Sequence, residues 1–412
     1  MPTIAWLPFT RRMFFRFLFL ALLIGGGIFA YLQTADAYPE LAYLKERRTL
    51  TFPELSAYFS RIAKEKGALY AYDILRRATL PPNTDTHLLG HVVGDALYQE
   101  KGIEGIGLCT EEFRNACSHT IVIGVLTEEG EAGLPAIASA CKQAPGGRGA
   151  YTMCFHGLGH GIFAYTDHDI GQTVALCRKT GTEAYQQREY IECFGGAVME
   201  LVGGTGHDKQ SLEVARKRYL SEIDPLAPCD SPLVPEELKP ICYTYLTPRL
   251  FTWEGGNLGA PTEEDFAKAF GLCERISRGE EESRRACFGG VGKELPTLAA
   301  KRDIRNIDEL KDEKLALLHT WCALAKSEEG REHCVRAIVQ SLFWGGENDP
   351  RAAISFCELA SPTSSFDACF DELLRATAFY LSPSLAALIC EKVPNGMRSR
   401  CTDGAAYYED LP

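Results

Sequence analysis

The sequence predicts an all-α protein, more specifically an α-solenoid of about eight to nine helical hairpins, each stapled by a local disulfide. Its sixteen cysteines form eight pairs, with 8 to 16 residues within a pair and 32 to 52 residues from one pair to the next. An even count at a recurring spacing is typical of local disulfides, and this period is typical of two-helix repeats. The expected bridges are Cys109–Cys117, Cys141–Cys154, Cys177–Cys193, Cys229–Cys242, Cys273–Cys287, Cys322–Cys334, Cys357–Cys369 and Cys390–Cys401.

Apolar residues beside the cysteines have helical spacing. Leu315, Leu318 and Cys322 follow one another at steps of three and four, and similar spacing follows Cys334. We therefore expect a helix that ends at the first cysteine of a pair, a polar loop, and a helix that begins near the second cysteine. A disulfide then needs Cα atoms about 4.4 to 6.8 Å apart. An irregular all-α bundle with incidental cysteine spacing is the alternative.

Residues 1–37 predict export across a membrane. Three arginines in the first 16 residues precede the apolar run 17–32, and positive charge there favours a cytoplasmic N-terminus. Residues 13–32 are long enough to span a bilayer, whereas the Ala-Asp-Ala sequence at 35–37 fits a cleavage site. We expect an uncleaved membrane anchor through residues 13–32, with a cleaved signal peptide and secretion as the alternative. Both place the cysteines outside the cytoplasm, where disulfides persist.

The remaining chain divides into three stretches. Residues 38–85 are expected to form a juxtamembrane stem and the first helices, residues 86–205 the histidine-bearing repeats, and residues 206–412 the other disulfide-stapled repeats. The formal net charge is −12 although the first 16 residues are basic, so the exported part is more acidic still. This charge argues against nucleic acid as a partner.

Five histidines in the first repeats are the candidates for chemistry. His87 and His91, like His156 and His160, follow the pattern His-x-Leu-Gly-His, which places both rings on one face of a helix. His119 lies two residues after the second cysteine of its pair, as His156 does, and His87 takes that position in the first unit. Such rings could hold a metal ion, with zinc or copper favoured and iron or nickel not excluded. The carboxylates that could complete the ligand set are Asp95, Asp167, Asp169 and Glu200.

The same histidines allow two other interpretations. They could be structural, with ring nitrogens bonded to loop carbonyls, or they could form a metal-free active site. Three glycines around His156 and His160 either let helices pack closely or let a ligand approach. In a regular stack, helices two repeats apart are about 16 to 20 Å apart. The two histidine pairs therefore share one site only if the stack is tightly curved, and otherwise form two sites.

The repeat period and the paired cysteines between residues 68 and 408 resemble the disulfide-stapled Sel1-like and tetratricopeptide-type solenoids of secreted cysteine-rich proteins. The resemblance implies a stack of helical hairpins and no functional residues. Two function classes remain. One is a membrane-anchored, exported helical-repeat protein with a metal site in its first three units. The other is a metal-free extracytoplasmic scaffold that binds a protein or peptide on a concave face. The patterns identify neither a reaction nor a catalytic residue.

Overall fold

The computed structural model describes residues 38–204, 209–345, 349–360, 365–381, 383–399 and 401. Throughout these ranges the secondary structure is helical and contains no strand, which confirms the all-α prediction. The segment predicted to enter the membrane, residues 13–32, lies outside them. Within the described ranges, no helix combines the length and apolar character needed to cross a bilayer.

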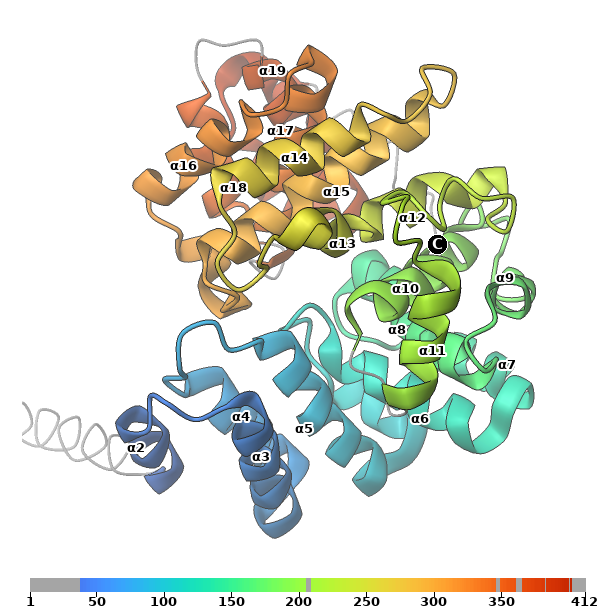
Figure 1. Ribbon diagram of the computed structural model, residues 1–412. Helices are drawn as coiled ribbons and strands as arrows, with labels where there is room; N and C mark the ends of the chain where they lie inside the picture. The colour runs from blue at the N-terminus through green and yellow to red at the C-terminus, as the bar shows by residue number, and fades with distance from the viewer. Residues whose placement is uncertain are drawn as a thin grey trace, which may run out of the picture.

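The helices form one stack that bends round on itself, from the blue helices through the green to the orange and red in Figure 1. Eight helices pack on one another in chain order, and we name them the inner helices: α5 (Thr86–Lys101), α6 (Ala116–Glu129), α8 (Gly147–Tyr165), α10 (Arg188–Gly203), α12 (Lys239–Tyr245), α15 (Glu281–Ala299), α17 (Glu328–Gly345) and α19 (Ser365–Tyr380). Between them in the chain lie α7 (Leu134–Cys141), α9 (Ile170–Arg178), α11 (Lys209–Tyr219), α13 (Thr247–Thr252), α14 (Glu263–Cys273), α16 (Asp312–Cys322) and α18 (Arg351–Leu359), and α20 (Pro383–Cys390) follows the last of them. The chain begins with α2 (Pro39–Glu46), α3 (Phe52–Lys66) and α4 (Ala68–Arg77), and both α3 and α4 pack on α5.

All eight predicted disulfides are present in the predicted pairing. Their Cα–Cα distances are 5.4 to 5.6 Å, inside the range that an unstrained bridge requires. In six pairs the first cysteine lies in the last turn of a helix, as expected, whereas Cys109 follows a short 3-10 helix and Cys229 lies in a turn. No cysteine is free, which indicates an oxidising compartment.

Glycines bring neighbouring inner helices into backbone contact. A Cβ atom at Gly159 on α8 would lie 1.8 Å from the carbonyl oxygen of Cys193 on α10, and one at Gly196 would lie 1.9 Å from the carbonyl oxygen of His156. Of the two interpretations of these glycines, close helix packing is the one found. Because the inner helices are closer to one another than the helices between them are, the stack curves toward its inner side.

The curved stack is closed by contacts between segments more than 200 residues apart. Arg302, just after α15, pairs with Asp85 at 2.6 Å, and Arg305 donates to the carbonyl oxygens of Leu75 and Ala78 at 2.8 and 2.6 Å. Elsewhere α19 contacts α8. The inner helices therefore form a ring, and their inner faces look toward one another.

Candidate metal centre

Five histidine rings gather on the inner faces of three consecutive helices. Ring centroids of neighbouring histidines are 4.7 to 6.4 Å apart. The separation of 16 to 20 Å expected for a regular stack does not apply, because the stack is curved and its inner helices pack closely. Since α6 lies between α5 and α8, its histidine lies between the two pairs. The five residues are His87 and His91 on α5, His119 on α6, and His156 and His160 on α8.

The first three histidines have the spacing of metal ligands. One nitrogen from each of His87, His91 and His119 lies within 4.8 Å of the other two. The Nε2 atoms of His87 and His91 are 3.1 Å apart. Two nitrogens bound tetrahedrally to one zinc at about 2.0 to 2.1 Å would be about 3.3 Å apart. The α5 pair therefore already has the separation of two ligands on one ion.

A backbone carbonyl fixes the orientation of the His87 ring. Its Nδ1 donates to the carbonyl oxygen of Phe113 at 2.6 Å, because a carbonyl can only accept. The neutral ring then has its lone pair on Nε2, which faces His91. Phe113, Arg114 and Asn115 all have positive φ, at 58°, 54° and 60°. Left-handed residues also precede α10, at Gln186 and Gln187, so this turn is a feature of the repeat rather than of the site. The structural interpretation thus holds for Nδ1 of His87, and Nε2 of His87 accepts a hydrogen bond from Nε2 of His91 at 3.1 Å, which a metal ion bound by both rings would replace.

His119 has no hydrogen-bond partner at either ring nitrogen among the described residues, although it is only 1% exposed. A neutral imidazole always has one N–H group and one lone pair. Each buried polar group without a partner costs about 1 to 3 kcal/mol. Burial, together with the neighbouring histidines, holds the pKa of His119 well below its usual value, so the ring is neutral. A metal ion would satisfy one nitrogen of this ring, because a metal binds the lone pair of a neutral imidazole.

The second pair is also held by hydrogen bonds. Nδ1 of His160 donates to Oε2 of Glu200 at 2.9 Å, so Nε2 of His160 faces Nε2 of His156 at 3.4 Å. A carboxylate that orients a histidine in this way is a common partner of metal ligands. Of the other carboxylates considered from the sequence, Asp95 and Asp167 are exposed and Asp169 caps α9.

Three further polar residues lie beside His156. The ring of Tyr245 on α12 is 4.7 Å from that of His156, and its hydroxyl donates to Glu192 at 3.4 Å. Nζ of Lys293 on α15 lies 4.3 Å from the centroid of the Tyr245 ring. Burial raises the pKa of Glu192 to about 7. Sequence patterns favoured a packing role for Tyr245 and a place in the repeat phrase for Lys293, and they did not single out Glu192. Lys293 is six residues after Cys287, as His160 is after Cys154, so the repeat position could have found it.

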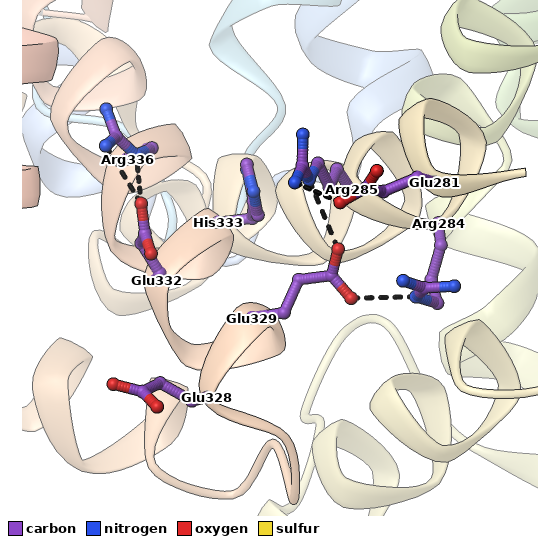
Figure 2. A pocket seen from close by; sticks show the side chains of 8 residues that line it. All are labelled: Glu281, Arg284, Arg285, Glu328, Glu329, Glu332, His333 and Arg336. Atoms are coloured by element: carbon purple, nitrogen blue, oxygen red, sulfur yellow. Dashed lines mark hydrogen bonds and ion pairs between the residues drawn. The ribbon is translucent and has the colours of Figure 1, made fainter. Parts of the chain in front are cut away.

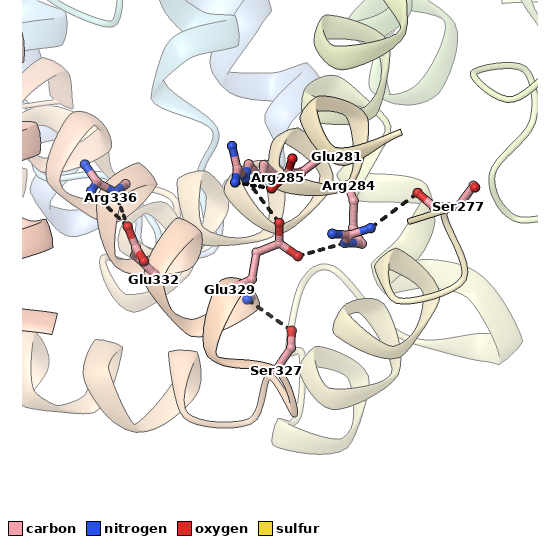
Figure 3. Close-up of polar contacts among 9 residues, drawn as sticks. Ser277, Glu281, Arg284, Arg285, Ser327, Glu329, Glu332 and Arg336 are labelled. Atoms are coloured by element: carbon pink, nitrogen blue, oxygen red, sulfur yellow. Dashed lines mark hydrogen bonds and ion pairs between the residues drawn. The ribbon is translucent and has the colours of Figure 1, made fainter. Parts of the chain in front are cut away.

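A separate cavity of about 580 Å³ lies between the first turns of α15 and α17 (Figure 2). Most of its charged side chains are paired with one another. Glu329 accepts from Arg284 at 2.8 Å and from Arg285 at 3.2 Å, and Arg336 pairs with Glu332 (Figure 3). This network ties two neighbouring inner helices together.

No family model, no curated protein and no solved structure matches the chain. The resemblance to Sel1-like and tetratricopeptide-type solenoids therefore extends no further than a cysteine-rich helical fold with local disulfides.

Acid should destabilise the metal-free chain through its buried histidines. Burial lowers the pKa of His87, His119 and His156 in the folded chain, whereas in the unfolded chain it is about 6.5. Below about pH 6.5 the unfolded chain binds more protons than the folded chain, so the free energy of unfolding falls as the pH falls. Above that pH these histidines are neutral in both states and do not change the free energy of unfolding. Each histidine contributes at most about 1.4 kcal/mol per pH unit. Glu192, with its raised pKa, works in the opposite direction.

The contribution of His119 can be isolated by a difference measurement. Urea unfolding of the chelator-treated wild type and of His119→Gln would be compared at pH 6.5 and 5.5, so that the groups that do not interact with His119 cancel. The wild type should lose up to about 1 kcal/mol more than the variant, because the unfolded ring is already half protonated at pH 6.5. Equal losses in the two proteins would mean that His119 is not a buried neutral ring.

Proposed function

We propose that this chain is a membrane-anchored, exported helical protein that binds a divalent transition-metal ion, zinc or copper, through His87, His91 and His119. The observation that carries the proposal is the buried ring of His119, whose two nitrogens have no protein partner within the described residues. It lies 5.5 Å, centroid to centroid, from both rings of the α5 pair. Imidazole ligands outside the cytoplasm suit zinc and copper. Because all sixteen cysteines are bridged, they do not compete for the metal.

The location and the site support each other. The eight disulfides fit an extracytoplasmic compartment, and residues 13–32 would anchor the chain in the membrane. The hydrogen bond from His87 to Phe113 orients a ligand before metal arrives, and the low pKa of His119 means that no proton must be displaced from the ring at neutral pH.

Metal analysis of the full-length, oxidised chain tests the proposal. Chelator-treated protein would be mixed with Zn²⁺ or Cu²⁺, freed of excess ion, and assayed for bound metal. Wild type should retain metal. Loss of a partner that only orients a ligand costs about 10- to 100-fold in affinity, so His119→Ala, which removes a ligand, should cost more.

His333→Ala is the matched control, because this histidine lies on α17 away from the cluster and should not affect metal binding. A wild-type protein that binds no metal would contradict the proposal. The chain would then be a metal-free scaffold for a protein or peptide on its concave face.

A further inference from the structure

His119 faces histidine pairs on both of its sides. The α5 pair is on one side, with ring centroids 5.5 Å from that of His119. On the other side, the rings of His156 and His160 on α8 are 5.8 and 6.2 Å away. Both α8 rings are buried, with 2% and 8% exposure. The rings of His91 and His160 are themselves 6.4 Å apart, so the five rings form one compact cluster in which His119 contacts both pairs.

The two pairs have matching geometry. Their Nε2–Nε2 distances are 3.1 Å on α5 and 3.4 Å on α8, and both are close to the separation of about 3.3 Å for two nitrogens on one tetrahedral ion. In each pair, one Nδ1 atom is held by an oxygen acceptor, the Phe113 carbonyl for His87 and the Glu200 carboxylate for His160. In the metal-free chain each Nε2–Nε2 contact is a hydrogen bond, which an ion bound by both rings would replace. Among the described residues, the α5 pair with His119 is the group whose ligand nitrogens all lie within 4.8 Å of one another.

One metal ion at the α5 pair uses only one nitrogen of His119. The other nitrogen would keep its N–H group, which is buried and has no acceptor among the described residues. A second ion on the side of α8 would remove this difficulty, because the nitrogen would lose its proton to solvent and bind that ion. The ring would then be an imidazolate with a metal on each nitrogen.

We propose that the five histidines hold two metal ions bridged by the imidazolate of His119, one ion chelated by His87 and His91 and the other by His156 and His160. This inference rests on the proposed function and extends it from one ion to two. The α8 rings are slightly farther from His119 than the α5 rings, so the first ion binds on the α5 side and the second follows with lower affinity. Binding of the second ion releases one proton from His119.

Copper titration of the full-length, oxidised chain tests this arrangement, with bound copper counted and the Cu²⁺ signal measured by electron paramagnetic resonance. At one equivalent, the spectrum should be that of an isolated ion. At two equivalents, wild type should bind two ions per chain, and the integrated signal should fall to less than half of that expected, because an imidazolate couples the two spins. His160→Ala should bind one ion with an uncoupled signal, and His333→Ala should behave as wild type.

The outcomes separate this inference from the proposed function. One copper per chain in the wild type would overturn the two-ion centre and leave the single site intact. No copper would overturn both. Two coppers with a full, uncoupled signal would overturn the bridge. Because these three readings come from the wild type, they do not depend on the folding of a variant, and the more conservative His160→Gln provides a second test of the α8 side.

Discussion

Reduction of the eight disulfides should unfold most of the chain. Each bridge closes a loop of 8 to 16 residues, and a bridge of this kind contributes about 2 to 4 kcal/mol, mainly by restricting the unfolded chain. Folded domains have a total stability of only about 5 to 15 kcal/mol. Even at the lower value, the loss of all eight bridges would exceed the stability of the folded state.

The test compares the chain refolded with and without reductant. The reductant would be added in mild denaturant, because all sixteen cysteines are buried, and the denaturant would then be removed. We expect loss of helical circular dichroism and of hydrogen-exchange protection in α8 and α17 in the reduced sample, and recovery of both when the bridges re-form. Unchanged protection in the reduced chain would show that the apolar core alone maintains the fold.

Replacement of Gly159 by alanine should be severely destabilising. The new Cβ would lie 1.8 Å from the carbonyl oxygen of Cys193, and backbone atoms cannot rotate away as a side chain can. Helices α8 and α10 would have to separate, with a cost of about 3 kcal/mol or more. Alanine is better than glycine in a helix by about 1 kcal/mol, so the steric term dominates.

Gly271→Ala is the matched control. Gly271 lies within α14, and a Cβ there would meet nothing within 4 Å. This variant should be unchanged or up to about 1 kcal/mol more stable than the wild type. Urea unfolding of both variants gives the comparison. A similar effect at the two positions would mean that α8 and α10 are not in backbone contact.

The features that the sequence predicted are those within a repeat. A disulfide such as Cys141–Cys154 depends only on the local geometry of one hairpin, and the cysteine spacing reports it directly. The common face of His156 and His160 follows from their separation of four residues on one helix. Both properties are independent of how the repeats are arranged in space.

The features that the sequence did not predict depend on the curvature of the stack. The contacts of Arg302 and Arg305 join segments more than 200 residues apart, and nothing local to either segment indicates them. The position of Tyr245 beside His156 likewise depends on how α10 and α12 follow α8 round the ring. The sequence does show a glycine inside a predicted helix at Gly159, where α8 meets the carbonyl of Cys193. A glycine at such a position is equally compatible with the close approach of a ligand, so the sequence alone did not predict the helix contact.

Closure of the ring sets the number of repeats. An open array of helical hairpins can gain or lose a unit, because each unit contacts only its neighbours. Here the segment after α15 must reach α4 and α5, where Arg302 pairs with Asp85. An extra hairpin inserted between α6 and α15 would carry that segment past its partner, and a deleted hairpin would leave it short. Chain length in this region is therefore constrained by geometry, and duplication or deletion of a whole repeat should be far less tolerated than in a linear array.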